Sequence, residues 1–260
     1  MFSSHAIHVL FRLSWVQFVT RYRGALFGVF WALLIPLLML AILTVVFSVI
    51  FPSRWGSDID INVPFAALLF SGLLVHSMCA EVITRSTICI TENPNYVKKV
   101  LFPLELLPIV IVVGAAIQGL IGFLILLALI ILYTGELPME VIVVPLLLVP
   151  YFVFLMGVSW ILASIGTFAK DVGHVAGLLV TLLLFVSPIL YPVNALPDWM
   201  QPYMYLNPLT FVVEEIRQLV IFGKISPVSQ YFTYYAAAIA SAGVGFKVFE
   251  CSKRYFADVI

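Results

Sequence analysis

Long apolar stretches, separated by short polar connections, run through the whole chain. A helix that crosses a hydrocarbon core of about 30 Å needs about 20 apolar residues, and six stretches match or approach that length. They cover residues 31–51, 65–83, 104–133, 141–168, 175–191 and 231–249. The pattern predicts an all-α polytopic membrane protein whose six transmembrane helices form one domain over residues 1–260.

The composition supports this fold class. Hydrophobic residues make up 63% of the 260 residues, charged residues make up 10%, and the mean hydropathy is +1.15. These values lie well outside those of an ordinary soluble domain. Almost no chain is left for a separate soluble catalytic domain.

The basic residues predict the topology, because the cytoplasmic loops of membrane proteins carry an excess of Lys and Arg. With the N-terminus inside, ten of the thirteen basic residues fall on the cytoplasmic side, namely Arg12, Arg21, Arg23, Arg85, Lys98, Lys99, Lys170, Lys247, Lys253 and Arg254. Arg54, Arg217 and Lys224 fall outside. Six helices return the C-terminus to the cytoplasm, so we expect both termini there.

Residues 1–23 have the pattern of a helix that lies in the membrane interface. Apolar residues recur there at helical spacing, at Ile7, Leu10, Phe11, Trp15 and Phe18, while His5, His8 and Arg12 share another face. Such a helix places its aromatic rings at the acyl boundary and its cations near anionic headgroups. The alternative is a cytoplasmic extension that does not bind the membrane.

Residues 84–103 form the longest predicted cytoplasmic loop. Asn93-Pro94-Asn95 is a turn or helix-start signal, and residues 96–101 are expected to form a short helix that carries Lys98 and Lys99. A short basic helix held against the membrane can press into a groove on a partner protein. The alternative is a solvated connector whose lysines only fix the topology.

Residues 192–227 are apolar, aromatic and rich in proline, yet the charge pattern assigns them to the outside. Asn207 reads as an N-cap, Pro208 as the first helical residue and Gly223 as the C-terminal stop. The apolar positions Leu209, Val212, Val213, Ile216, Leu219 and Val220 keep a helical period, with Glu214, Glu215 and Arg217 off that face. This helix is too short to span, so we expect a re-entrant or interfacial element, preceded by a shorter one that starts near Trp199.

The sequence shows no motif typical of an enzyme active site. It has no Gly-rich phosphate loop and no His or Cys pattern for a metal, so we expect no cofactor, no metal site and no nucleic-acid partner for this chain. His76 is expected to be a packed or hydrogen-bonded histidine, and Glu81 with Arg85 an ion pair at the inner end of a helix. A membrane-embedded enzyme would need an acid, base or nucleophile that we do not find.

Two glycine pairs have the four-residue spacing that lets helices approach closely. They are Gly24 with Gly28, and Gly173 with Gly177. We expect one of the pairs to mark a helix contact, either within one subunit or between two.

Five segments resemble, in order, the membrane subunits of polysaccharide ABC exporters of the ABC-2 type, and O-antigen exporter permeases of Gram-negative bacteria most of all. They are residues 21–28 (RYRGALFG), running into Trp31 and Pro36, then 93–105 (NPNYVKKVLFPLE), 170–172 (KDV), 187–192 (SPILYP) and 205–209 (YLNPL). Two positions depart from the family pattern: Leu104 stands where a basic residue is common, and Lys170 where arginine is common. Capsule and teichoic acid exporters are the next most similar families.

The resemblance implies a transport subunit without its own ATPase site. It implies a homodimer in the bacterial inner membrane, joined by two copies of a separate cytoplasmic ATPase that binds ATP and Mg²⁺. Lipid-linked polysaccharide would be the substrate, and membrane lipid the surroundings. Export of a capsular or teichoic polymer, or of a small amphiphile, is the alternative for the same architecture.

Together, the residue patterns and the resemblance give four sets of candidate functional residues. Coupling to the ATPase is assigned to Asn95, Tyr96, Lys98 and Lys99, and the inner gate or interface to Arg21, Arg23 and Gly28. The periplasmic gate is assigned to Trp199, Asn207, Pro208, Glu214 and Arg217. Candidate aromatic residues for stacking on a sliding sugar chain are Phe27, Phe30, Trp31, Tyr151, Phe154, Trp160 and Tyr191, although aromatic rings also form the interfacial belts of membrane proteins.

Overall fold

The computed structural model describes residues 4–47, 63–98 and 102–260, with side chains in the first stretch from residue 10 onward. Every regular element in these residues is helical. The elements are α1 (Ser4–Arg21), η1 (Gly28–Phe30), α2 (Trp31–Val45), α3 (Phe65–Ser86), α4 (Pro94–Val97), α5 (Leu106–Thr134), η3 (Met139–Val143), α6 (Val144–Phe168), α7 (Val172–Val186), η4 (Val193–Ala195), α8 (Gln201–Met204), α9 (Pro208–Arg217), η5 (Gln218–Phe222), α10 (Val228–Lys253) and α11 (Phe256–Val259). The all-helical class predicted from the sequence is confirmed for the described residues.

Four stretches in the described residues are long and apolar enough to cross a membrane. They are Gly28–Val45, Phe65–Ser86, Leu106–Thr134 and Met139–Phe168. These four overlap the first four predicted spans. α7 is apolar but has only 15 residues, and α10 has 26 residues of lower mean hydropathy.

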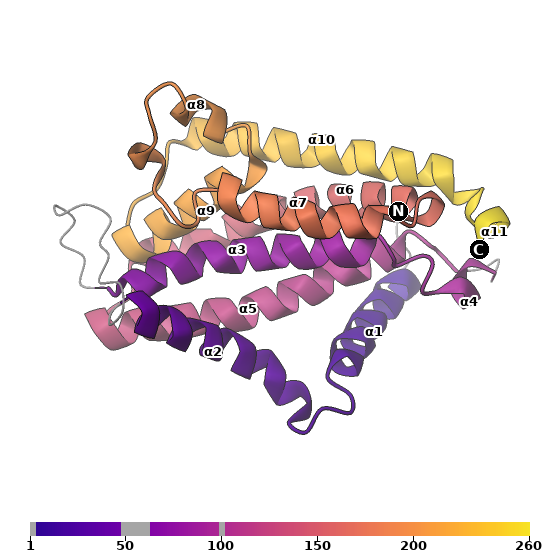
Figure 1. The fold of residues 1–260 in the computed structure, drawn as a ribbon, viewed down its shortest axis with the longest axis horizontal. Helices are drawn as coiled ribbons and strands as arrows, with labels where there is room; N and C mark the ends of the chain where they lie inside the picture. Colours follow the sequence, from indigo (N-terminus) through magenta and orange to yellow (C-terminus); the bar gives the residue numbers. More distant parts are fainter. Residues whose placement is uncertain (1–3, 48–62, 99–101) are drawn as a thin grey trace.

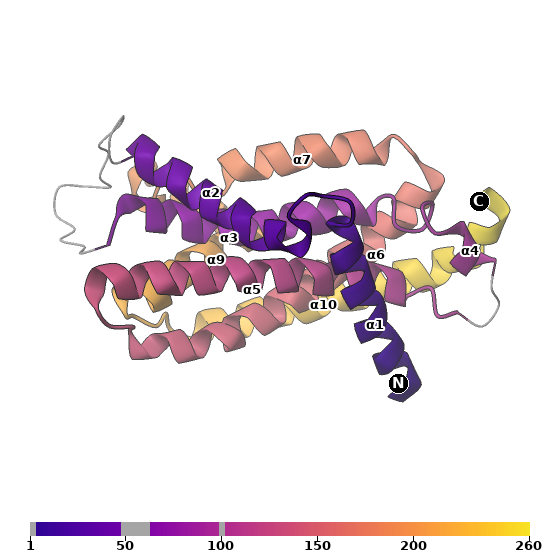
Figure 2. The ribbon, with the colours of Figure 1, turned by 90° about the horizontal axis from the view of Figure 1, so that it is seen from below.

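The long helices α3, α5, α6, α7 and α10 run side by side along the long axis, and α1 crosses them near one end (Figure 1, Figure 2). Both termini, α4 and α11 lie toward that end, whereas α8 and α9 lie toward the other. Segments that the charge pattern assigns to one side of the membrane therefore gather at one end of the bundle. Residues 192–227, assigned to the other side, lie at the opposite end.

α6 and α10 pack against each other at a pair of glycines. A Cβ atom on Gly157 would overlap the backbone of Ser241, and a Cβ on Gly245 would overlap the backbone of Gly157. Small residues at a crossing allow two backbones to touch. The closest contact of these two helices therefore depends on glycines from different helices, not on one repeated motif.

The glycine pairs singled out in the sequence make no such contact within the subunit. A Cβ on Gly177 would meet nothing within 4 Å, and one on Gly173 would only reach ordinary van der Waals contact. Gly24 and Gly28 have φ angles of +89° and +51°, which L side chains rarely adopt. They shape the turn between α1 and α2. Neither pair marks a close helix contact within this subunit, and a contact of Gly173 and Gly177 between two subunits stays a prediction.

α1 is helical as predicted, but its aromatic residues do not share one environment. Ser14 and Phe18 are buried, whereas Phe11 and Trp15 are 64% and 60% exposed. Phe18 and Tyr22 pack beside α5, and the Tyr22 hydroxyl donates a hydrogen bond to Gln118 Oε1 at 2.9 Å. The predicted single apolar face is therefore divided: one part packs on the bundle and the other lies on the exposed surface of α1. The side chains of His5, Ile7 and His8 lie outside the described residues.

Candidate functional site

α9 begins at the helix cap that the sequence predicts. The Asn207 Oδ1 atom accepts a hydrogen bond from the Leu209 backbone N–H at 3.0 Å, and Pro208 is the first residue of α9. The Asn207 side-chain amide donates to Ser187 Oγ at 2.8 Å, which ties α9 to the end of α7. The helix continues as the π-helical η5 and stops at Gly223, whose φ is +60°. The predicted start and stop are both confirmed.

Arg217 lies inside the bundle with 1% of its surface exposed. Its guanidinium donates three hydrogen bonds to backbone carbonyls, from Nε to Leu68 at 3.1 Å, from Nη1 to Pro188 at 2.6 Å and from Nη2 to Ile189 at 2.8 Å. Nη1 also pairs with Glu214 at 3.1 Å. One side chain therefore joins α9, α3 and the segment that follows α7.

The expectation that Arg217 and Glu215 lie off the buried face was wrong. Periodicity places charged residues toward solvent by default, but a buried charge is tolerated when every donor has a partner. The carbonyls of Pro188 and Ile189 need donors because α7 has ended at Val186. A Cβ on Gly72 would stand 2.9 Å from Arg217 Nη2, so the glycine leaves room for the guanidinium.

Glu215, also 1% exposed, connects α9 to the last long helix. Its Oε1 atom accepts a hydrogen bond from the Tyr231 hydroxyl at 2.6 Å and another from the Ser226 backbone N–H at 3.1 Å. Sequence reasoning missed this residue. The available signal was three charged residues within one short apolar helix, because ionisable groups in such surroundings usually have a specific partner. Trp199, upstream, is 69% exposed and takes no part in this cluster.

At the other end of the bundle, Glu81 pairs with two arginines. The predicted pair with Arg85 is present at 3.5 Å. Arg21, which the sequence did not connect with Glu81, donates to it from both terminal nitrogens, with Nη1 3.1 Å from Oε2. Burial lowers the pKa of the Arg21 guanidinium, and repulsion from Arg85 lowers it further. This contact ties α1 to the end of α3, while Arg23 is exposed at the following turn.

The expected coupling segment is a single helical turn, α4, that starts earlier than predicted. Pro94 occupies its first position, and Asn93 donates from its side chain to the Cys89 carbonyl at 2.8 Å. Asn95 and Lys98 are exposed, whereas Tyr96 is partly buried and packs on Phe102 with ring centroids 4.4 Å apart. Lys99 lies outside the described residues. Tyr96 thus anchors the turn, and Asn95 with Lys98 faces outward.

The seven candidate aromatic residues do not form one surface within the subunit. Tyr151 is fully buried and donates to the Val75 carbonyl at 2.7 Å; Trp160 donates from Nε1 to the Glu105 carbonyl at 3.1 Å. These two belong to the subunit core because their polar atoms have partners there. The others are exposed or half-buried, namely Phe27, Phe30, Trp31, Phe154 and Tyr191.

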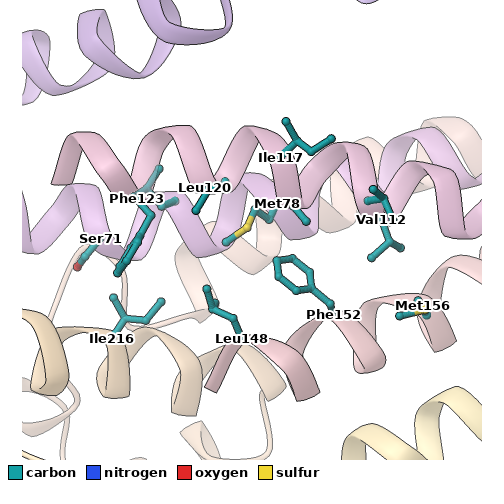
Figure 3. A pocket seen from close by; sticks show the side chains of 14 residues that line it. Ser71, Met78, Val112, Ile117, Leu120, Phe123, Leu148, Phe152, Met156 and Ile216 are labelled. Carbon is teal, nitrogen blue, oxygen red and sulfur yellow. The ribbon is translucent and has the colours of Figure 1, made fainter. Parts of the chain in front are cut away.

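An apolar cavity of about 360 Å³ lies between α3, α5, α6 and α9, with Met78, Phe123 and Phe152 on its walls (Figure 3). Its one polar side chain, Ser71, donates to the Leu68 carbonyl at 2.8 Å. A space of this kind offers no hydrogen-bond partners to sugar hydroxyls.

On α3, His76 Nε2 lies 3.0 Å from the Val180 carbonyl oxygen, which agrees with the expected hydrogen-bonded histidine.

Comparison with known proteins places this chain in a family of membrane transport proteins. The sequence model of that family, described as "ABC-2 type transporter", matches residues 8–221. The chain belongs to the ABC-2 type transporter family.

The chain is 24% identical over 244 residues to the O-antigen export system permease protein RfbA of Myxococcus xanthus, covering 92% of this chain and 90% of that protein. The protein of the same name from Klebsiella pneumoniae is 24% identical, with the same coverage. The polysialic acid transport protein KpsM of Escherichia coli is 29% identical over 214 residues, which cover 80% of this chain and 79% of KpsM. The likeness to polysaccharide export permeases extends over nearly the whole chain.

Proposed function

We propose that this chain is the transmembrane subunit of an ATP-driven exporter that moves lipid-linked O-antigen polysaccharide from the cytoplasm to the periplasm. The observation that carries the proposal is the similarity to O-antigen export permeases over 92% of the chain. The protein resides in the bacterial inner membrane with both termini in the cytoplasm. ATP and Mg²⁺ are bound by a separate ATPase subunit.

In this proposal six helices cross the bilayer, namely α2, α3, α5, α6, α7 and α10. At 1.5 Å per residue, α10 is about 39 Å long and can span, although its polar residues lower its hydropathy. α7 is only about 22 Å long. The residues that follow it, 187–189, are held by Asn207 and Arg217 and complete the crossing of the bilayer. α9 enters from the outer side and returns.

The exporter is a homodimer, and the polysaccharide passes at its two-fold interface. A large apolar core fills the interior of the single subunit, so a wide conduit is more readily built between two copies. α7 exposes Leu178, Leu182 and Phe185 by 61%, 51% and 60%, which supplies apolar surface for a partner or for lipid. Phe27, Phe30, Trp31, Phe154 and Tyr191 are the aromatic residues accessible enough to line a conduit.

The ATPase docks beneath α4, where Asn95 and Lys98 are exposed for contact. The Asn93 bond to the Cys89 carbonyl links the start of α4 to the turn that follows α3, and the pair of Arg21 with Glu81 links α3 to α1. Movement of α4 reaches α3 and α1 by this route. Nucleotide binding drives the change because the ATPase makes different contacts in its two states. At the outer end, the cluster around Arg217 holds α9 in place as the gate, with Asn207, Pro208 and Glu214 positioning it.

A capsular polymer is the second candidate substrate, and the similarity to KpsM favours it. A strain that lacks this chain, supplied with the gene on a plasmid, separates the two. Restored O-antigen on the cell surface supports the first candidate, and restored capsule supports the second. Normal amounts of both polymers in the deletion strain would contradict a role in polysaccharide export.

A further inference from the structure

A groove of about 350 Å³ lies at the end of the bundle that carries α4. One wall comes from α1, and the others come from the end of α3, the connection to α4 and the start of α5. Its lining residues include Leu13, Val16, Arg21, Arg85, Leu107 and Val110.

The charges at this groove do not balance. The described charged side chains that line it, Arg21 and Arg85, are both cations. They share one carboxylate, that of Glu81, so this cluster of three side chains has an excess of one positive charge; Glu92, near Cys89, is exposed and does not line the groove. Burial, helped by nearby Glu92, raises the pKa of the Cys89 thiol to about 12, so the thiol adds no negative charge. Guanidinium groups present forked N–H donors that fit phosphate and carboxylate oxygens. The polar side of the groove is therefore suited to an anion.

The other side of the groove is apolar. Leu13 and Val16 of α1 and Leu107 and Val110 of α5 line it. It lies where α3 ends and α5 begins, and both of these helices are long and apolar enough to cross a membrane. On the outer surface of α1, exposed Trp15 is typical of the headgroup level. A ligand that fits both sides has a charged head and an apolar tail.

We propose that this groove binds the phosphate group of a membrane lipid, with Arg21 and Arg85 on the phosphate and the apolar wall on the first part of the chain. Two sources share this chemistry: a bilayer phospholipid, and a phosphorylated lipid carrier of the exported glycan. The second source rests on the proposed function. A protein segment of the ATPase is a less suitable occupant, because an acidic headgroup with an attached chain matches both walls at once.

The test uses the purified full-length chain in a maltoside detergent, which contains no phosphate. Isothermal titration calorimetry measures binding of farnesyl diphosphate, phosphatidylglycerol, farnesol and inorganic diphosphate. The variants are Arg21→Gln, Arg85→Gln and Glu81→Gln. Arg12→Gln is the matched control, because Arg12 lies exposed on the same helix and does not line the groove.

We expect the phosphorylated lipids to bind at least tenfold more tightly than farnesol or inorganic diphosphate. Arg21→Gln and Arg85→Gln should each raise the Kd about tenfold or more, while Arg12→Gln leaves it unchanged. Glu81→Gln removes the carboxylate that competes for both arginines, so it should lower the Kd. If the pair of Arg21 with Glu81 only holds α1 in place, Glu81→Gln and Arg21→Gln should both raise the Kd.

The two lipid sources give different results within this assay. Preference for phosphatidylglycerol identifies a bilayer phospholipid, and preference for farnesyl diphosphate identifies a lipid carrier. Equal affinity for farnesol, or Kd values that ignore both arginines, would overturn the proposal. So would arginine variants that bind lipid normally but no longer co-purify with the ATPase, because the groove would then be a protein-docking surface. Binding is measured without the ATPase, so a failed export assay does not affect this result.

Discussion

Arg217 reaches α3 at the one residue of that helix turn that has no side chain, Gly72. A Cβ atom at Gly72 would stand 2.9 Å from Nη2 of Arg217. The contact brings the guanidinium to the carbonyls of Leu68, Pro188 and Ile189, which belong to segments far apart in the sequence. Gly72 on α3 and Arg217 on α9 therefore determine how α9 packs on the bundle.

We expect Arg217→Met to destabilise the subunit by roughly 3–5 kcal/mol, because it leaves three buried carbonyls without these donors and Glu214 without its cation. Arg217→Lys should recover only part of the loss, since an ammonium cannot span the three carbonyls. Thermal unfolding of the purified protein in detergent measures the effect. The control is Arg254→Met, at an exposed position. An unchanged Tm for Arg217→Met would contradict the assignment.

Gly72→Ala should lower the Tm as well, because the added methyl group displaces the guanidinium. If the two act as one unit, the double variant Gly72→Ala with Arg217→Met will lose less than the sum of the single losses. Additive losses would show that Gly72 and Arg217 act independently.

Tyr231→Phe tests the buried carboxylate of α9, that of Glu215. The substitution removes the hydroxyl that donates to Glu215 and leaves the carboxylate with the Ser226 N–H. We expect a loss of about 1–3 kcal/mol, from the desolvation penalty of an incompletely bonded buried group. Tyr203→Phe, at a tyrosine that is 66% exposed, should have little effect. Equal Tm values for the two variants would argue against a structural role for the Glu215 bond.

The contact between α6 and α10 can be tested with two glycines of one helix. Gly245→Ala places a methyl group on the backbone of Gly157 and should destabilise by about 1–3 kcal/mol. Gly243→Ala meets nothing within 4 Å and should be neutral or slightly stabilising, because Ala favours a helix. A smaller loss for Gly245→Ala than for Gly243→Ala would be inconsistent with the packing described.

Lys98→Glu tests coupling to the ATPase. Lys98 is exposed beside α4, so the reversal should leave the fold and the amount of protein unchanged while surface polysaccharide falls at least tenfold. Immunoblots of the polymer and of the subunit measure both. Lys224→Glu makes the same charge change at an exposed site in the outer segment and should retain export. Full export by the Lys98→Glu variant would remove α4 from the coupling path.

Features set by neighbouring residues were predictable from the sequence. The Asn207 cap, Pro208 at the first helical position and the Gly223 stop each follow from local backbone chemistry, and the structure contains all three. The pair of Glu81 and Arg85 was predictable for the same reason, since residues four apart share a helix face.

Features set by distant segments were not predictable in this way. Arg217 and Leu68 are separated by 149 positions, and Arg21 and Glu81 by 60. A periodicity analysis assigns each charge to a face of its own helix and has no information on which carbonyl or carboxylate another helix supplies. The close contact of α6 and α10 was not predictable either, because Gly157 and Gly245 meet across two helices that are far apart in the sequence.

The most direct test of the whole account is transport by purified components. The chain and its ATPase are reconstituted in vesicles, lipid-linked polysaccharide is supplied on the side of the ATPase, and its appearance on the other side is followed over time. We expect transport only when both subunits and ATP are present. Movement of polysaccharide by this chain alone, or transport that is indifferent to ATP, would contradict the account.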